Sequence, residues 1–502
     1  MTSSVRFNHW IGVCDLARYG AAVEISAALA AISLAALTYA AGWLSPGQAG
    51  LLTTGLLFTL IALAWIRFHS GCHPAFYFLC LLALFQGGRL IAGETDPFRV
   101  VLMTSIQFDV SRTVAGTVLL SLAWSALVIY AVCRWNYRPL APLETGTFRK
   151  FLPCLHGLFW MSVPIQLYKN YCYYAYARDH GGYLVFFIDH GSMAASIPMA
   201  VRAISLVSLP ALAGIFVLEN SGRRLRTVTL VYFAVAAPVL ITGSRGALFS
   251  LILALWYVRQ ARAAHRIRPQ ALAAITAALV VVGALVGSLR DEGTPSRPFA
   301  GPAGFIADQG SSLNVTEVAV LQRAAFAPHI GSYLENELKS AFVAADQENY
   351  VPGQRFSDDA AMYLNPVTYR LGFGCGSSYV AEAHILAGLA GVVLVSAAIG
   401  LLLRAMHRAS AHPLGLFLVT MILPDVLWMP RGGLLDWVSA SLRTAVSLLV
   451  VAAGWWLYRS LAYITGLLGQ VASSRVAPDR QCLSGLALSC SATVSADREG
   501  NA

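Results

Sequence analysis

"TVTLVYFAVAAPVLITGSRGALFSLILALWYV", residues 227–258, is an apolar run whose single charged side chain is Arg245. A membrane-crossing helix needs about 20 apolar residues, so this run is long for one crossing and short for two. Arginines flank it on both sides, within residues 223–226 and 259–268. A single crossing would put one of these basic clusters outside, whereas cytoplasmic loops normally carry the excess of Lys and Arg. Two short helices with a turn at residues 243–246 are therefore the better interpretation.

The composition of the rest of the chain agrees with a membrane protein. The 502 residues are 57% hydrophobic and 12% charged, with a mean hydropathy of +0.62. We expect an all-α polytopic integral membrane protein with about twelve transmembrane helices. The expected spans lie near residues 20–43, 49–67, 72–92, 113–133, 151–171, 200–219, 227–242, 247–258, 271–290, 378–403, 414–429 and 434–458.

The formal charge of +10 does not indicate a nucleic-acid partner, because basic residues in polytopic proteins mark cytoplasmic loops. The nine cysteines are scattered singly, which predicts neither a disulfide framework nor a zinc site. The loop at residues 291–376 carries ten acidic and five basic residues, so it is predicted to be external and periplasmic. The expected organisation is a transmembrane domain, 1–474, that includes this loop, followed by a disordered cytoplasmic tail, 475–502.

Two arginines occupy glycine-flanked turns on the predicted external face. Arg245, with Ser244 beside it, lies at the tip of the short hairpin, and Arg431 lies in "LWMPRGGLLDW", residues 427–437. An arginine at the bilayer centre costs about 2.5–3.5 kcal/mol, so a recessed one usually faces a polar cavity or an anion. Both guanidinium groups could converge on one diphosphate. The alternative is that Gly and Pro make ordinary turns with solvated or snorkelling arginines.

Further candidates flank the external loop. In "LGFGCGSSYVAEAHILAGLAG", residues 371–391, Glu382 could act as a general base on a sugar hydroxyl or simply cap a helix start. His384 is the second candidate for the base. In "IADQGSSLNVTEVAVLQR", residues 306–323, Gln309 and Ser311 suit sugar hydroxyls, although they also suit a helix cap. No phosphate-binding loop, HExxH or DxD motif is present, so no metal or other cofactor is expected.

Four of these motifs, "TGSRGALFSLILAL", "DQGSSLNV", "GFGCGSSYVAEAHILAGLAGVVLVSAAIGLLL" and "WMPRGGLLDW", resemble in order and spacing the bacterial O-antigen polymerase (Wzy-type) family over residues 160–450. The resemblance implies a GT-C-like enzyme of the inner membrane with its active face in the periplasm. Its substrate would be undecaprenyl-diphosphate-linked oligosaccharide units, with the growing chain transferred to the non-reducing end of a new unit. Arg245 and Arg431 would bind the departing diphosphate, and Glu382 would be the base. A chain-length regulator protein is an expected partner.

Two other functions are compatible with this composition. An O-antigen ligase would use the same chemistry, but no clear His-Asn motif begins the span near residue 378. A flippase or exporter of lipid-linked sugars would typically show internal repeats and charges at mid-membrane. Here no convincing repeat is found, and the notable charges gather at one face.

Overall fold

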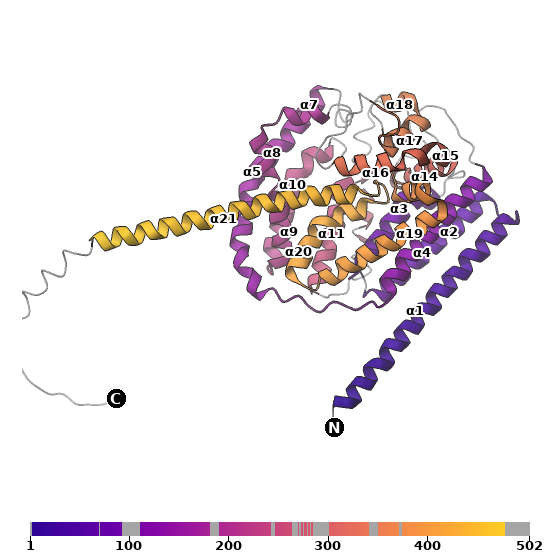
Figure 1. Ribbon diagram of the computed structural model, residues 1–502, viewed down its shortest axis with the longest axis horizontal. Coiled ribbons are helices and arrows are strands. Elements are labelled where there is room, and N and C mark those ends of the chain that lie inside the picture. Colours follow the sequence, from indigo (N-terminus) through magenta and orange to yellow (C-terminus); the bar gives the residue numbers. More distant parts are fainter. Residues whose placement is uncertain are drawn as a thin grey trace, which may run out of the picture. The chain divides into compact units, whose positions relative to one another are not determined.

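The computed structural model describes residues 3–69, 71–92, 111–180, 190–241, 246–263, scattered positions between 270 and 284, 301–340, 350–370 and 374–476. Within these ranges the regular structure is helical, which confirms the predicted all-α class (Figure 1). The chain divides into two units, Met1–Ala445 and Val446–Ala502. The first unit holds the helical bundle and the candidate site, and the described part of the second is a continuation of the last helix.

In its described residues, the first half of the chain forms mostly long apolar helices, with three short ones among them. These are α1 (Ser3–Ala40), α2 (Pro46–Arg67), α3 (Pro74–Ile91), α4 (Arg112–Arg134), η1 (Gly146–Phe151), α5 (Leu152–Asp179), α7 (His190–Ala195), α8 (Met199–Ser205), α9 (Ser208–Leu218), α10 (Gly222–Ile241) and α11 (Gly246–Ala263). Their starts are locally encoded. At α2, for example, Ser45 and Gln48 form a reciprocal capping box, with Pro46 in the first turn.

The second half alternates short helices with long ones. These are α13 (Pro302–Gln309), α14 (Ser312–Leu321), α15 (Arg323–Phe326), η3 (Ala327–His329), α16 (Ile330–Lys339), α17 (Phe356–Leu364), α18 (Pro366–Arg370), α19 (Tyr379–Ala409), α20 (Pro413–Trp428) and α21 (Asp436–Val476).

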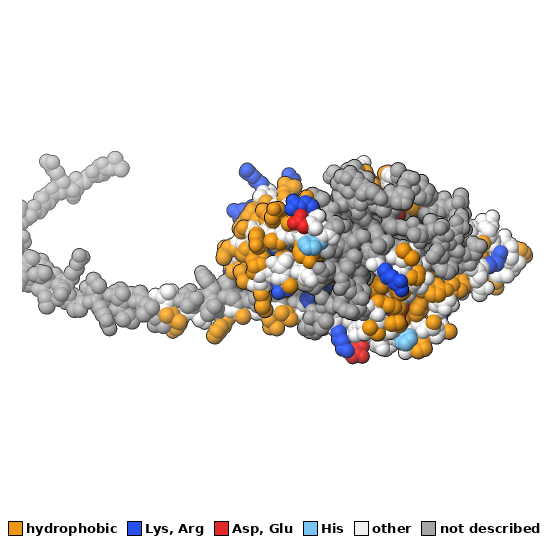
Figure 2. Space-filling view, turned by 90° about the horizontal axis from the view of Figure 1, so that it is seen from above, with side chains coloured by type: hydrophobic (Ala, Val, Ile, Leu, Met, Phe, Trp, Pro, Cys, Tyr) orange, Lys and Arg blue, Asp and Glu red, His pale blue; other side chains and the backbone are white. Residues whose placement is uncertain are grey.

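Six stretches of described helix are long and apolar enough to cross a membrane. They are Gly20–Ala40, Pro46–Arg67, Pro74–Ile91, Arg112–Arg134, Met199–Leu218 and Tyr379–Ala409. Hydrophobic side chains also cover much of the described surface seen in Figure 2. Leu34 of α1 and Leu51 and Phe58 of α2 are among the exposed large apolar side chains. A surface of this kind suits lipid contact. The chain therefore has the features of a multi-pass membrane protein.

Five of the other expected spans coincide with helices that do not meet the same criteria, namely α5, α10, α11, α20 and α21, and the expected span at 271–290 lies largely outside the described residues. α20 is apolar but has only 16 residues, and α10 and α11 are separate helices that each carry arginines. Their separation agrees with the hairpin interpretation of residues 227–258, although the turn at 242–245 lies outside the described residues. The number of twelve spans remains a prediction.

The centre of the bundle is formed by α4 and α19, which lie side by side (Figure 1). Within this apolar core three hydroxyl groups form a chain. Ser125 on α4 and Tyr379 on α19 are joined by a 2.6 Å hydrogen bond, and Ser396 donates to Ser125 at 2.9 Å. Inter-helical hydrogen bonds of this type help to fix helix packing where water is absent.

α19 is broken near its start. Ala387 and Gly388 have non-helical dihedral angles, and the φ of 62° and ψ of −145° at Gly388 suit only glycine. In an unbroken helix the amide of residue 388 would donate to the carbonyl of His384. The break removes that bond, and the Nε of Arg323 donates to the same carbonyl at 3.1 Å. The segment before the break is thus a short half-helix with a satisfied end.

Of the helices between residues 301 and 370, α14, α15 and α16 contact α19, α13 packs on α3, and α17 packs on α14 and α18. Their second apolar core contains Val315, Phe326, Tyr333 and Phe356, and it extends onto Ala381 and Ile385 of α19. Tyr333 and Tyr350 both donate to the buried carboxylate of Asp359, at 2.6 and 2.7 Å. The described parts of the predicted external loop, residues 301–340 and 350–370, are therefore mainly helical, and they share an apolar core with the start of α19.

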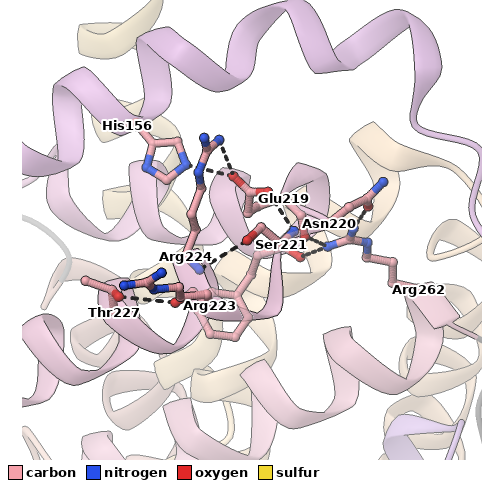
Figure 3. A network of polar contacts seen from close by, with 9 residues as sticks. His156, Glu219, Asn220, Ser221, Arg223, Arg224, Thr227 and Arg262 are labelled. Carbon is pink, nitrogen blue, oxygen red and sulfur yellow. Dashed lines mark hydrogen bonds and ion pairs between the residues drawn. The ribbon is translucent and has the colours of Figure 1, made fainter.

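Basic residues from α5, α10 and α11 lie around one buried acid, Glu219, whose negative charge offsets part of their positive charge (Figure 3). Glu219 lies 3.2 Å from His156 and 3.6 Å from Arg224, and Arg262 donates to the carbonyl of Glu219 and to the side chain of Asn220. Burial would raise the pKa of Glu219, but the amide of Ser221, His156 and Arg224 together hold this pKa below its ordinary value. The carboxylate therefore stays charged and fixes the α9–α10 turn.

Candidate functional site

The glycine-rich loop before α19 and the Arg431 turn are bound together by their backbones. The amide of Ser377 donates to the carbonyl of Arg431 at 3.3 Å, and the amide of Tyr379 donates to that of Met429 at 3.2 Å. Gly376 has a φ of 75° and lies against the Arg431 carbonyl. A residue with a side chain would be strained in this conformation. The loop and the turn thus form one rigid unit.

Gln86 of α3 joins a third segment to this unit. Its side-chain amide donates to the hydroxyl of Ser378 at 2.7 Å and to the carbonyl of Pro430 at 3.0 Å, and it accepts from Thr316 of α14 at 3.0 Å. Gln86 is 1% exposed. A buried amide with its donors and its acceptor all engaged specifies one arrangement of the segments that it contacts.

Arg431 and Gln309, which sequence reasoning proposed separately, are in direct contact. The Nη1 of Arg431 donates to the Oε1 of Gln309 at 3.0 Å, and the guanidinium lies over the rings of Phe85 and Trp428, 5.7 and 5.9 Å from their centroids. Ser311 follows in the same turn and is the N-cap residue of α14, but its side chain makes no capping hydrogen bond. The expected helix-cap role of Ser311 is therefore not seen in this structure.

Glu382 is 1% exposed. It also contacts the unit that the glycine-rich loop and the Arg431 turn form. Ser377 donates its hydroxyl to the Oε1 of Glu382, and the amide of Leu434 donates to its Oε2 at 2.7 Å. The third donor is Glu337 of α16, whose carboxyl hydrogen-bonds to that of Glu382. Glu382 thus links the glycine-rich loop, the Arg431 turn and the folded loop region.

The pKa of Glu337 is well above its ordinary value. Burial is the main cause, and the negative charges of Glu382 and Asp436 add to it. The protonated form of Glu337 is therefore favoured, and in this form its carboxyl can donate to Glu382. The Glu337 carboxyl also lies close to the backbone of Gly433, because a Cβ added at Gly433 would overlap with it. Only glycine leaves room for this pair.

His384, the alternative base, faces a different environment. Its ring is 6% exposed, and its Nδ1 has no hydrogen-bond partner among the described residues. Its backbone carbonyl is the one that receives Arg323. The structure thus places Glu382 in the Arg431 network, whereas the described contact of His384 is that of its backbone carbonyl with Arg323.

Arg245 and Ser244 lie outside the described residues, so their distance from Arg431 stays untested. Sequence reasoning missed Gln86 and Glu337. The signal for Gln86 was present, since a glutamine interrupts the apolar run "LLALFQGGRL", residues 81–90. Glu337 gave no such signal, because it is one acid among ten in the loop.

Within the described residues, no cluster of three or more His, Cys, Asp or Glu side chains has the geometry to hold a metal ion. What the site offers is a positioned guanidinium, neutral hydrogen-bonding groups on α13 and α14, and a hydrogen-bonded carboxyl pair. All of these lie where long apolar helices meet a folded loop region. Such an arrangement is suited to a membrane protein that handles a polar, anionic substrate.

The fold and the site thus define a polytopic helical membrane protein with a polar site at one end of its bundle. The family described as O-antigen polysaccharide polymerase Wzy matches residues 28–458 of the chain. The chain belongs to this family, which confirms the resemblance carried by the four motifs. No curated protein and no solved structure matches the chain.

Proposed function

We propose that the protein polymerises undecaprenyl-diphosphate-linked oligosaccharide repeat units at the periplasmic face of the bacterial inner membrane. Membership of the Wzy family supports polymerase activity on lipid-linked oligosaccharides in a membrane. The observation that carries the more specific proposal is the convergence of Arg431, Gln309 and the Glu382–Glu337 pair at one end of the apolar bundle. A GT-C-like architecture and a chain-length regulator as partner belong to the same proposal.

In the proposed reaction, a hydroxyl at the non-reducing end of a new unit attacks the anomeric carbon of the growing chain. The new carbon–oxygen bond forms as the bond from that carbon to the diphosphate breaks, and the bonding electrons leave with undecaprenyl diphosphate. Arg431, together with Arg245, stabilises the negative charge that grows on the diphosphate. A fixed donor directed at developing charge contributes about 2.7–4 kcal/mol in comparable sites.

The hydroxyl proton passes to Glu382 in this proposal. In the structure Glu382 is closed in by Ser377, Leu434 and Glu337, so acceptor binding has to open one of these contacts. Catalytic hydrogen bonds are often completed only in the substrate complex. Gln309, which accepts from Arg431, and Ser311, two residues further along the chain, would contact the sugar hydroxyls.

The test uses purified full-length protein and a synthetic polyprenyl-diphosphate repeat unit. Wild type, Arg245→Ala, Arg431→Ala and Glu382→Gln are compared for polymer length and released carrier. We expect a ladder from wild type and at least a 100-fold lower rate from each variant, in line with the loss of one transition-state donor or a general base. Arg370→Ala is the matched control, since Arg370 is exposed in the same loop region. Wild-type rates in all three site variants would refute the assignment.

A further inference from the structure

A second polar site lies at the other end of α19, away from Glu382. A cavity of about 210 Å³ is lined by His73 before α3, by residues 136–141 after α4, and by Arg404, His407 and Arg408 in the last turns of α19. At 1.5 Å per residue, Arg404 lies about 30 Å along the helix from Glu382. The cavity is smaller than the roughly 300–1,000 Å³ typical of pockets for drug-sized ligands, so it suits a compact group.

The charge of this cavity is entirely basic. Arg138, Arg404 and Arg408 all line it, together with His73 and His407, and its lining includes no acidic residue. The structure shows no ion pair for any of the three arginines with a described acidic residue, and the Nε of Arg404 is buried without a hydrogen-bond partner. Arg138 and Arg408 are exposed and Arg404 is half-buried, so water screens part of the repulsion between these guanidinium groups. An anion bound between them would remove the rest.

His73 adds a buried donor. It is 0% exposed, and its Nδ1 accepts from the amide of Ala75 at 3.1 Å, so in the neutral ring the proton is on Nε2. That Nε2 is buried and has no hydrogen-bond partner among the described residues. Burial, followed by the charges of His407 and Arg404, lowers the pKa of His73, which keeps the ring neutral. A buried N–H without a partner costs about 1–3 kcal/mol, and a ligand that accepts from it would recover this cost.

Two other groups of arginines at helix ends have an acid beside them. Glu219 compensates Arg224 (Figure 3), and Glu24 lies 2.5 Å from Arg67 and 3.6 Å from Arg134. The cavity at the end of α19 departs from this pattern. Its missing negative charge is the observation that points to a bound anion.

We propose that this cavity binds a phosphate group, held by the guanidinium groups of Arg138, Arg404 and Arg408 and by the Nε2 of His73. Guanidinium groups match the geometry of phosphate oxygens and keep their charge when desolvated. The cavity lies at the ends of helices long enough to cross a membrane, where lipid phosphates lie, and basic pockets between such helices bind anionic headgroups. The phosphate can therefore come from a phospholipid headgroup or from free phosphate in solution.

The test measures binding to full-length protein that has been stripped of lipid in a neutral detergent. The probes are phosphatidylglycerol, phosphatidylcholine and inorganic phosphate, with native mass spectrometry and the rise in melting temperature as readouts. We expect phosphatidylglycerol to bind at least about tenfold more weakly to Arg404→Gln and Arg408→Gln than to wild type. Arg408 is exposed, so its variant should fold even if the other does not. Arg259→Gln, an exposed arginine outside the cavity, is the control.

Binding of phosphatidylglycerol without binding of inorganic phosphate supports the proposal and identifies a lipid headgroup as the source. Binding of inorganic phosphate that the same variants weaken also supports it and identifies free phosphate. The proposal is overturned if neither phosphatidylglycerol nor inorganic phosphate binds to wild type, or if the cavity variants bind them like the control. Binding of phosphatidylcholine, which carries the same phosphodiester, supports the proposal if the cavity variants weaken it. None of these results depends on polymerase activity.

Discussion

Three consecutive backbone amides in the Arg431 turn each donate to a different carboxylate. Gly433 donates to Asp436 at 2.6 Å, Leu434 to Glu382 at 2.7 Å, and Leu435 to Glu337 at 2.7 Å. The turn that presents Arg431 is therefore fixed by the acids beneath it.

Gly433→Ala tests this packing directly. The added methyl group would overlap with the Glu337 carboxyl, so the glutamate pair must separate, at a cost of about 1–3 kcal/mol for an overpacked site. We expect a lower melting temperature and at least a tenfold loss of polymerisation rate. Gly331→Ala is the matched control, because a Cβ there meets nothing within 4 Å. A Gly433→Ala protein with wild-type stability and rate would contradict the arrangement.

Glu337→Gln tests the protonated form of Glu337. The pKa of Glu337 is raised above its ordinary 4.5, so between 4.5 and the raised value the folded state binds a proton that the unfolded state lacks. The contribution of Glu337 to the free energy of unfolding is complete below pH 4.5. It is lost as the pH rises through the folded-state pKa, by at most about 1.4 kcal/mol per pH unit. Glutamine is neutral at every pH. The melting temperature of the variant should therefore fall less steeply than that of wild type between about pH 5 and 9. Parallel curves for the two proteins would refute the raised pKa.

At the scale of elements, the break in α19 separates the half-helix that carries Glu382 from the membrane-length remainder. Non-helical backbone at such a position is tolerated where it is buried in protein or lines a cavity. Arg323, reaching from α15, satisfies the carbonyl that the break exposes. The break thus couples the position of Glu382 to the folded loop region.

Gly388→Ala should damage this element. Its φ of 62° and ψ of −145° would cost an alanine about 1–3 kcal/mol, so the half-helix would realign towards continuous helix. We expect a lower polymerisation rate with little change in helix content by circular dichroism. Gly55→Ala in α2, where a Cβ meets nothing within 4 Å, is the control. An unchanged rate would show that the break does not position the site.

The elements differ in how far the sequence predicts them. Apolar helices such as α4 follow from local hydropathy, and the turn glycines near Arg431 were visible in the motif. The contact between Arg431 and Gln309 joins residues 122 positions apart, so no local pattern encodes it. The same holds for Gln86, which meets Ser378 and Pro430 from another helix. Glu337 could not be recognised because its partner Glu382 lies across a tertiary interface.

At the scale of the whole molecule, polar features divide between two ends. The Arg431 site and the folded region of residues 301–370 lie at one end of α19, and the arginines around residues 404–408 lie at the other. The positive-inside rule then predicts that the basic end is cytoplasmic and the Arg431 end periplasmic. This sidedness is part of the proposed function.

Labelling of single cysteines tests the sidedness in a background without the nine native cysteines. Glu335→Cys and Arg226→Cys are both at exposed positions, at opposite ends of the bundle by this account. A maleimide that cannot cross the inner membrane should label residue 335 in intact cells with a permeabilised outer membrane. Residue 226 should react only after lysis. The reverse pattern would invert the proposed orientation.

The proposed reaction releases one undecaprenyl diphosphate for each glycosidic bond that forms. The most direct measurement counts new glycosidic bonds and released undecaprenyl diphosphate for full-length wild type in proteoliposomes supplied with a synthetic repeat unit. We expect one carrier to be released for every bond formed, and we expect Arg431→Ala to lose bond formation and carrier release together. Movement of the intact lipid-linked unit across the bilayer without carrier release would contradict it and would identify a transporter.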